Sequence, residues 1–183
     1  MHERRADGRV LRDAEPGDLP AVVRVYNESI PGRLATADTE PVSVASRQTW
    51  FAGHDPARRP LWVLVGGDGI EGWVSLQDYY LGRAAYDATA EVSVYVAAGR
   101  QGRGVGGILL DAVVDAASTL RVETLLAVVF AHNEPSLRLF TRRGFDRWGL
   151  MPSIAVLDGV ERSVAVLGRR LVPRVGDRAD GAA

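Results

Sequence analysis

The sequence of 183 residues contains no cysteine and no lysine, and only three histidines. Without cysteine there can be no disulfide, no thiolate nucleophile and no thiolate-bound zinc. Without lysine there can be no Schiff base and no lysine-containing phosphate-binding P-loop, and arginine supplies all 22 basic residues. His2, His54 and His132 are never four residues apart, which excludes the helical zinc motif with histidines at i and i+4.

The charge balance and the apolar runs argue against two further classes of protein. The formal net charge is −1 at pH 7, whereas a general nucleic-acid binder carries a strong basic excess. The uninterrupted apolar runs fall far short of the roughly 20 residues that span a bilayer. Residues 1–12 are charged and lack the apolar core of a secretory signal. We therefore expect a cytoplasmic protein that takes neither nucleic acid nor a membrane as a partner.

The composition predicts a single globular domain with unstructured ends. Hydrophobic residues make up 46% and charged residues 25% of the chain, which is close to the average for soluble proteins. Residues 1–9 are polar and rich in arginine, and residues 173–183 mix Pro, Gly, Asp and Arg without an apolar period. We expect a flexible N-terminus at 1–9, one domain at 10–172 and a flexible tail at 173–183.

Between these ends, strand and helix patterns alternate, and the fold class they predict is α/β with a mixed sheet. Helical spacing of apolar residues indicates helices at residues 19–26, 44–51, 108–116 and 137–143. Alternating or continuous apolar runs indicate strands at residues 10–12, 61–65, 70–77, 89–96, 125–130, 153–157 and 162–167. Because the four tryptophans fall in these patterns, we expect them in the core, at Trp50, Trp62, Trp73 and Trp148.

A glycine-rich turn lies between the strand at 89–96 and the helix that follows it. Five of the nine residues from Gly99 to Gly107 are glycine. Glycine lets a backbone approach a ligand closely, and the free N–H groups at a helix N-terminus attract phosphate. Arg100 and Arg103 add positive charge and bidentate donors. The turn predicts a phosphate site; the alternative is a flexible surface turn with two solvated arginines.

The position of the glycine-rich turn disfavours a nicotinamide dinucleotide as the phosphate-containing ligand. Gly102-x-Gly104-x-x-Gly107 fits the dinucleotide pattern, but that loop belongs after the first strand of a domain, and several strands precede this one. The acidic residue at suitable spacing, Glu123, precedes a strand instead of ending one. Position in the chain therefore disfavours a nicotinamide-dependent oxidoreductase.

The motifs taken together resemble the GNAT family of N-acetyltransferases. The pyrophosphate motif of that family is similar to Gln101-x-x-Gly104-x-Gly106, and the further matching segments are 91–96, 133–140 and 143–145. Within that family, the chain more specifically resembles the phosphinothricin and methionine sulfoximine acetyltransferase branch, at residues 26–27, 38–41, 50–51 and 90–96. The resemblance covers residues 10–171. It implies a mixed, mostly antiparallel sheet flanked by helices, in which two parallel strands splay apart around acetyl-CoA.

The resemblance also implies which residues hold acetyl-CoA, the co-substrate. Val94, Tyr95 and Val96 would present backbone groups to its pantetheine arm and thioester, with a backbone N–H near Val96 polarising the thioester oxygen. The pyrophosphate would lie on the turn, at Gln101, Gly102, Arg103, Gly104, Val105, Gly106 and Gly107. Asn133 and Ser136 match positions that contact the lower pantetheine, although Asn133 is equally a good helix cap. No metal is implied.

Glu91 matches the presumed general base of the branch. Strand alternation places it on one face with Ser93 and Tyr95, where a carboxylate is costly unless it is wet or paired. The alternative role for Glu91 is an ordinary ion pair with an arginine. The position where the family often carries a tyrosine or histidine acid is Phe140, which cannot donate a proton. Either the thiolate leaves without a dedicated acid, or another group serves, or catalysis is weakened.

Candidates for another acid are Tyr95, Tyr86 and His132, each of which is equally read as packing or surface. The acceptor would be a small-molecule primary amine, an amino acid or a toxic analogue such as phosphinothricin or methionine sulfoximine, bound by residues 27–40 and 78–86. Arg83 could hold a carboxylate and Tyr86 could supply a wall, alongside Glu91. Ala37 stands where the branch usually has an aromatic residue. The alternative function is an acetyl-CoA-binding sensor, and the resemblance also allows a homodimer.

Overall fold

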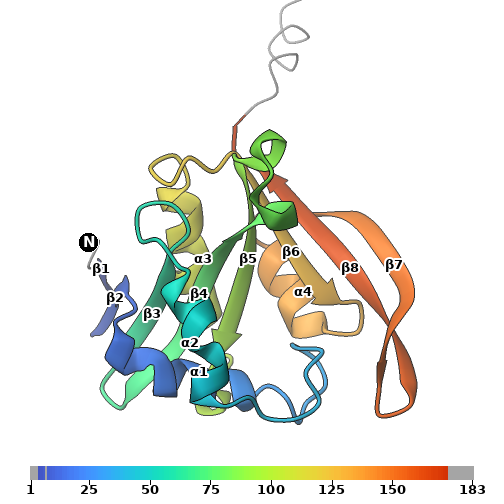
Figure 1. Ribbon diagram of the computed structural model, residues 1–183, viewed down its shortest axis with the longest axis horizontal. Helices are drawn as coiled ribbons and strands as arrows, with labels where there is room; N and C mark the ends of the chain where they lie inside the picture. The colour runs from blue at the N-terminus through green and yellow to red at the C-terminus, as the bar shows by residue number, and fades with distance from the viewer. Residues whose placement is uncertain (1–3, 7, 173–183) are drawn as a thin grey trace, which may run out of the picture.

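The computed structural model describes residues 4–6 and 8–172, which form one central sheet with helices on both faces (Figure 1). The sheet has eight strands in the order β1-β2-β3-β4-β5-β6-β8-β7. Its strands are β1 (Arg4–Ala6), β2 (Arg9–Asp13), β3 (Leu61–Gly66), β4 (Gly69–Asp78), β5 (Thr89–Val96), β6 (Thr124–Phe130), β7 (Asp146–Leu157) and β8 (Val160–Arg170). The α-helices of the described part are α1 (Leu19–Asn27), α2 (Val44–Ala52), α3 (Val105–Ala116) and α4 (Glu134–Thr141).

The predicted α/β class with a mixed, mostly antiparallel sheet is confirmed, with two corrections. Within the N-terminal segment expected to be flexible, Arg4–Ala6 forms a strand that pairs with β2. The predicted tail at 173–183 lies outside the described residues. Trp62 and Trp73 are buried as expected, but Trp148 is 50% exposed, because it covers the surface of Gly168 and not the core.

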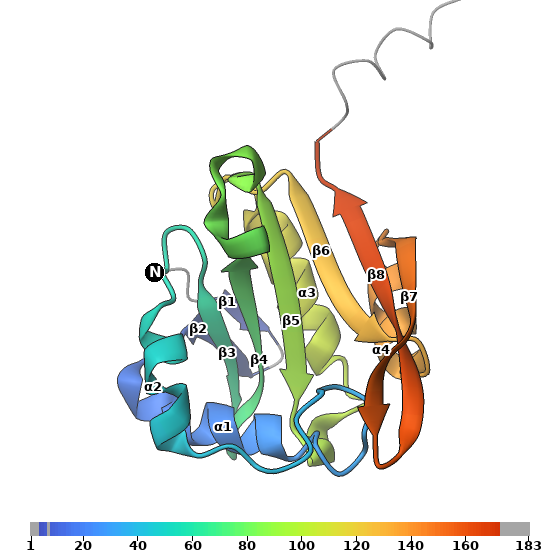
Figure 2. The ribbon, with the colours of Figure 1, turned by 45° about the vertical axis from the view of Figure 1, so that its right-hand side comes forward.

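Strands β5 and β6 are the parallel pair, and they stay together for only three residue pairs. Thr89, Ala90 and Glu91 pair with Thr124, Leu125 and Leu126. Beyond Glu91 the two strands diverge, and Figure 2 shows them closest at their beginnings and furthest apart at their arrowheads. On its other side, β6 pairs with β8 along its whole length, from Thr124 to Phe130. The predicted splay is therefore present, and the β6-facing edge of β5 is unpaired past Glu91.

The central strands β4 and β5 have two chemically different faces. On one face, Val74, Leu76 and Val92 pack with helix α3 in the larger hydrophobic core, to which Phe140 of α4 also belongs. The opposite face lies under α1 and α2, where Trp73 belongs to a smaller core. Because successive side chains of a strand point to opposite faces of the sheet, the alternating sequence of these strands gives the two faces their different composition.

The connection from α1 to α2 (residues 28–43) crosses the open end of the β5–β6 gap (Figures 1 and 2). Its return towards α2 is fixed by the Asn27 side chain, which bonds both the N–H and the C=O of Val42 at 2.9 Å. Nearer the start of the connection, Arg33 forms a bidentate ion pair with Asp158 in the β7–β8 turn. This connection therefore joins the two halves of the splayed sheet.

Among the described residues, no helix is long and apolar enough to cross a membrane. In the same part of the chain, no group of three or more His, Asp or Glu side chains is placed to hold a metal ion.

Candidate active site

Glu91 lies where β5 and β6 part, paired in register with Gln77 of β4 on one side and Leu126 of β6 on the other. The side chain is partly buried, and within residues 4–6 and 8–172 its carboxylate has no hydrogen-bond or ion-pair partner. Burial without a compensating charge raises the pKa of Glu91 above its ordinary value. The predicted alternative, an ion pair with an arginine, is absent from this part of the chain.

Glu91 belongs to a ladder of cross-strand pairs on the face under α1 and α2. The register places Gln77 opposite Glu91, Ser75 opposite Ser93 and Trp73 opposite Tyr95. The indole of Trp73 stacks on the Tyr95 ring with centroids 4.5 Å apart. The ladder therefore changes from aromatic at one end to polar at the end that carries the carboxylate.

A cavity of about 110 Å³ lies between this ladder and the two helices. Its floor comes from β4 and β5, and its roof from α1, α2 and Val42 of the connection between them. The lining residues are Val22, Val23, Tyr26, Val42, Arg47, Trp50, Trp73, Ser75, Gln77, Ser93 and Tyr95. Since Gln77 and Ser93 are the ladder neighbours of Glu91, the cavity lies next to that carboxylate.

Arg47 on α2 is held beside the cavity by a polar network. Its Nη2 donates to Asp38 at 2.8 Å, and its guanidinium lies 4.9 Å from the centroid of the Tyr26 ring. The Tyr26 hydroxyl donates to Asp38 at 2.6 Å and lies 2.5 Å from the hydroxyl of buried Thr36. Burial, followed by the Asp38 bond, raises the pKa of Tyr26. The network orients Arg47 and leaves its other guanidinium donors without a described protein partner.

The glycine-rich turn has the geometry of an anion site. Helix α3 begins at Val105, and its N-cap Gly104 has φ +79°, a left-handed conformation that other residues adopt with strain. A side chain at Gly104 would meet no atom within 4 Å, so the turn faces open space. Arg103 is exposed with no described side-chain partner, whereas Arg100 is paired with Asp68 and lies 3.4 Å from Glu71. Of the two arginines expected to add charge, Arg103 alone is free for a phosphate.

Asn133 is confirmed as a helix cap. Its Oδ1 accepts from the Ser136 N–H at 3.1 Å, and its Nδ2 donates to the Leu34 carbonyl at 2.9 Å. The side chain is buried and both of its polar atoms bond to protein. Contact of Asn133 and Ser136 with a ligand stays a prediction.

The candidates for a general acid are otherwise engaged. Phe140 is buried against Phe145, with ring centroids 5.0 Å apart. The Tyr95 hydroxyl donates to the Ala35 carbonyl at 3.2 Å, and burial raises its pKa further above the usual range. His132 Nε2 bonds the Arg33 carbonyl at 2.9 Å. Phe140 has no acidic proton, and the Tyr95 hydroxyl and His132 Nε2 are each bonded to a backbone carbonyl, so the identity of a general acid stays a prediction.

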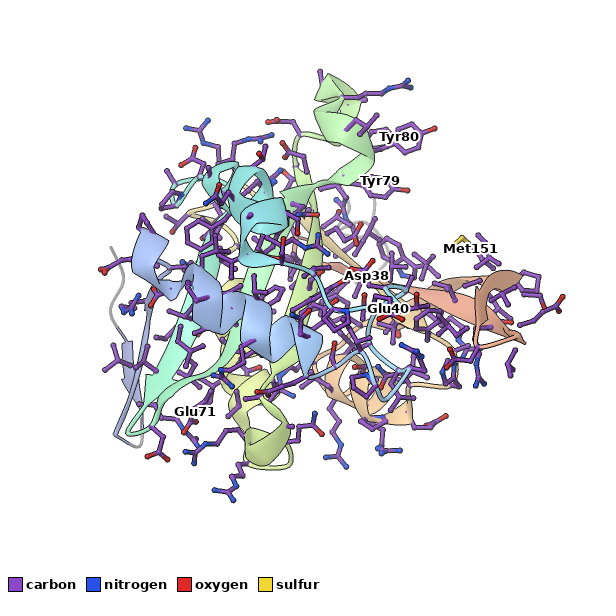
Figure 3. All side chains as sticks on the ribbon, turned by 60° about the horizontal axis from the view of Figure 1, so that its bottom comes forward. Asp38, Glu40, Glu71, Tyr79, Tyr80 and Met151 are labelled. Atoms are coloured by element: carbon purple, nitrogen blue, oxygen red, sulfur yellow. The ribbon has the colours of Figure 1, made fainter. Side chains whose placement is uncertain are left out.

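Arg83 and Tyr86 are not brought to the cavity. They belong to a cluster at the far end of the β4–β5 connection, where the Arg83 guanidinium lies 5.1 Å from the Tyr80 ring and Tyr86 packs edge-on against Tyr79. Figure 3 shows Tyr79 and Tyr80 at the outer end of this connection, well apart from Asp38. A role for Arg83 and Tyr86 in binding the acceptor stays a prediction that the cavity does not support.

Sequence reasoning missed Arg47, Ser75 and Gln77. The serine and the glutamine could have been found from β4, whose alternation puts Trp73, Ser75 and Gln77 on one face. Pairing that strand antiparallel with β5 across the loop brings Gln77 opposite Glu91. Arg47 gave no such signal, because only the tertiary position of α2 turns it towards the cavity.

Comparison with known proteins assigns the family. The acetyltransferase (GNAT) family matches residues 21–145. The YwnH protein of Bacillus subtilis, named provisionally as a phosphinothricin acetyltransferase, is 46% identical over 162 residues, which cover 88% of this chain and 98% of that protein. A Pseudomonas paraeruginosa L-methionine sulfoximine/L-methionine sulfone acetyltransferase is 32% identical over 147 residues, covering 79% of this chain and 84% of that protein.

A solved structure has the same fold with the donor bound. The crystal structure of a Sinorhizobium meliloti phosphinothricin acetyltransferase in complex with acetyl-CoA matches with a TM-score of 0.83 at 26% identity, over 95% of this chain and 97% of that chain. The splayed strands and the open glycine turn described above fit that co-substrate. The chain therefore belongs to the GNAT family and is an acetyl-CoA-dependent N-acetyltransferase.

Proposed function

We propose that this enzyme acetylates the primary amine of a small molecule, an amino acid or a toxic analogue such as phosphinothricin or methionine sulfoximine. The observation that carries the proposal is the unpartnered, partly buried carboxylate of Glu91, next to both the β5–β6 gap and the cavity under α1 and α2. An amine in the cavity and a thioester in the gap would meet beside this group. The names of the relatives support the choice of acceptor.

In the proposed mechanism Glu91 acts as the general base. A primary amine is protonated near neutral pH, and the Glu91 carboxylate takes that proton directly or through one water. The neutral amine nitrogen then bonds to the acetyl carbon as the carbon–sulfur bond breaks, the electron pair leaves on sulfur, and the nitrogen gives up a second proton to water as the amide forms. In this mechanism the thiolate departs without a side-chain acid and is protonated from water, since Phe140 has no acidic proton and the Tyr95 hydroxyl is bonded to the Ala35 carbonyl.

The chain's own groups would hold acetyl-CoA along the gap. The unpaired edge of β5 at Val94, Tyr95 and Val96 offers backbone hydrogen-bonding groups to the pantetheine amides. The residues from Gln101 to Gly107, with the first N–H groups of α3, would hold the pyrophosphate. Acetyl-CoA supplies an activated acetyl group to a site whose protein groups bind, orient and deprotonate.

The proposal is tested by following CoA release with a thiol reagent, over a panel of amino acids, phosphinothricin, methionine sulfoximine, polyamines and aminoglycosides. The protein has no cysteine, so it adds no background to this assay. Saturable turnover on amino acids or their analogues is expected. Turnover confined to polyamines or aminoglycosides would contradict the proposed acceptor, and binding of acetyl-CoA with no turnover at all would favour the sensor.

The pyrophosphate assignment is tested by Gly104→Glu. A carboxylate at this open position of the turn should repel the pyrophosphate and abolish acetyl-CoA binding in calorimetry. Gly159→Glu is the matched control, because Gly159 also has a left-handed φ, of +78°, and faces open space, but it lies in the β7–β8 turn. Equal affinity of both folded variants would contradict the assignment.

We further propose a cytoplasmic homodimer. Large apolar side chains are exposed on the three strands at the β7 edge of the sheet, and they are Val128, Trp148, Leu150, Ile154, Val156 and Val160. A contact between two copies would cover them. A chain without cysteine gains nothing from an oxidising compartment, which supports the location. Light scattering that gives the mass of a monomer at micromolar concentration would contradict the dimer.

A further inference from the structure

A buried carboxylate, that of Glu71, lies next to the glycine-rich turn. Glu71 is only 5% exposed, and it belongs to the end of β4 that is remote from Tyr79 (Figure 3). The register of β3 against β4 passes over Glu71, from Ile70 to Gly72, so Glu71 is the extra residue of a β-bulge. Bulges re-aim a side chain and are frequent next to active sites. The position of this carboxylate is therefore a specific feature of the strand.

Two arginines compensate the buried charge, one from the sheet and one from the turn. Arg9 of β2 places its Nε 2.7 Å from Glu71 Oε2, and Arg100 places its Nε 3.4 Å from Glu71 Oε1. Arg9 also donates from Nη1 to the Arg103 carbonyl at 3.5 Å. Glu71 Oε2 has no hydrogen bond among the described residues, so attraction between charges holds it. Removing one member of such a set leaves a buried charge without compensation.

Glu71 also holds the backbone at the start of the turn. Its carbonyl accepts from the Ala97 N–H at 2.9 Å, where β5 has just ended. A side chain on Gly66 would collide with the Glu71 carboxylate, which shows how closely that carboxylate is packed. Arg100 pairs in addition with Asp68, in the β3–β4 turn. The turn that leads into α3 is therefore fastened to β2 and β4 at several points along its length.

Electrostatic attraction alone gives no reason for an acid at this place. The group expected on the turn is the pyrophosphate of acetyl-CoA, and a negative charge nearby repels it. Glu71 also takes up the charge of Arg9 and Arg100, which would otherwise attract phosphate. An acid here favours binding only if it fixes the geometry of the turn, because N–H groups at a helix start bind an anion best when they are held ready for it.

We propose that Glu71 is a positioning residue for acetyl-CoA. Through Arg9 and Arg100 it fixes residues 99–107 in the conformation that presents their N–H groups to the pyrophosphate. The inference rests on the proposed pyrophosphate site and adds the group that keeps that site in shape. Loss of the Glu71 carboxylate weakens binding of the nucleotide part of acetyl-CoA and leaves the transfer step and the acceptor site unchanged.

Two substitutions that change the local charge in opposite directions test this role. Glu71→Gln removes a negative charge beside the turn, and Arg100→Gln removes a positive one. If Glu71 fixes the turn, both variants should bind acetyl-CoA about 10-fold more weakly in calorimetry on the full chain, since misplaced binding groups cost this much or more. If only charge mattered, Glu71→Gln would bind acetyl-CoA more tightly than the wild type. Equal or tighter binding by folded Glu71→Gln would overturn the proposal.

Asp18→Asn is the matched control, because it breaks another ion pair of β2. Asp18 pairs with Arg12, and both side chains are largely shielded from solvent. Neither residue contacts the turn in any described bond. Asp18→Asn should lower stability and leave the affinity for acetyl-CoA within about twofold. A loss of affinity as large as that of Glu71→Gln would overturn the specific role of Glu71.

A comparison of two acetyl donors separates positioning from general support of the fold. S-Acetylpantetheine has the thioester and the pantetheine arm of acetyl-CoA but no phosphate. In Glu71→Gln, kcat/KM should fall about 10-fold with acetyl-CoA and stay within about twofold with S-acetylpantetheine, while KM for the amine is unchanged. An equal loss with both donors would mean that Glu71 only supports the fold.

Glu71→Asp keeps the test decisive if Glu71→Gln does not fold. It retains the charge and shortens the side chain by one methylene, so the carboxylate no longer reaches both arginines. Positioning predicts weaker binding of acetyl-CoA and the same difference between the two donors. Wild-type affinity in Glu71→Asp would overturn the proposal.

Gly104→Glu distinguishes failure of this inference from failure of the proposed pyrophosphate site. If Gly104→Glu abolishes acetyl-CoA binding while the Glu71 variants bind like the wild type, the site stands and the role of Glu71 fails. If Gly104→Glu binds acetyl-CoA like the wild type, the site fails and the role of Glu71 fails with it. Weakened binding in all of these variants supports both.

Discussion

The two faces of the β4–β5 strand pair are made by the same stretch of chain but differ in chemistry. The face towards α3 is built from aliphatic side chains such as Val74, Leu76 and Val92, all buried in the larger core. The face towards α1 and α2 carries Ser75, Gln77 and Glu91, whose polar groups have no described protein partner. Alternate residues of these two strands therefore pack in the core on one side and line or adjoin the cavity on the other.

The difference teaches where free energy is gained and where it is given up. Each aliphatic side chain on the α3 face gains the full transfer free energy of burial. On the other face, the partly buried carboxylate of Glu91 costs stability when it is ionised, because no described charge compensates it. Substitutions on the two faces should therefore separate the free energy of unfolding from the catalytic rate.

The largest effect is expected on the apolar face. Leu76 is 0% exposed, and Leu76→Ala should lower the free energy of unfolding by about 2–5 kcal/mol. Urea unfolding followed by tryptophan fluorescence measures this loss. The kcat of the molecules that remain folded should stay within about threefold. A fall in kcat with little loss of stability would break the comparison.

The opposite pattern is expected for Glu91→Gln, which keeps the size of the side chain and removes the base. Steady-state kinetics should show kcat lowered by about 100-fold or more. The raised pKa of Glu91 means that the folded state favours its protonated form, so its ionised form opposes folding above that pKa. Glu91→Gln should therefore raise Tm at neutral pH. An unchanged rate would make Glu91 a structural residue.

A smaller effect distinguishes the two arginines that could hold a carboxylate. Arg47→Gln should raise KM for an amino acid about 10-fold or more, as expected when a bidentate ion pair is lost. Arg83→Gln should change KM by less than about threefold, because an exposed charge outside the cavity contributes little. A larger increase in KM for Arg83→Gln than for Arg47→Gln would place the carboxylate site at the 79–86 connection instead.

The sequence predicted the fold and the position of the glycine turn well, because both depend on local pattern. The strand at 89–96 agrees with β5 at both ends, and the glycine turn lies at the start of α3 as predicted. The helix predicted at 137–143 begins earlier, at Glu134, because Asn133 caps it. The strand predicted at 153–157 begins at Asp146, because β7 follows β8 through two register shifts.

The acceptor side was less predictable, because its residues converge only in three dimensions. The aromatic loop with Arg83 suggested a binding site from composition alone, but Arg58 and Arg59 hold Asp78 at its base, and its rings pack on one another. Arg47 was passed over since nothing near it in sequence indicates the cavity. The face of a sheet on which a strand residue lies can be inferred from the two-residue period of the sequence. The angle at which a helix packs on the sheet cannot be inferred from such a local pattern.

The pH dependence of kcat/KM for the wild type and Glu91→Gln tests the central claim most directly. We predict that activity of the wild type falls as the pH is lowered through a pKa above the ordinary range of a glutamate, because the base must be ionised to accept a proton. In Glu91→Gln this acidic limb should disappear from the residual rate. An acidic limb that persists unchanged in the variant would contradict the assignment of Glu91 as the base.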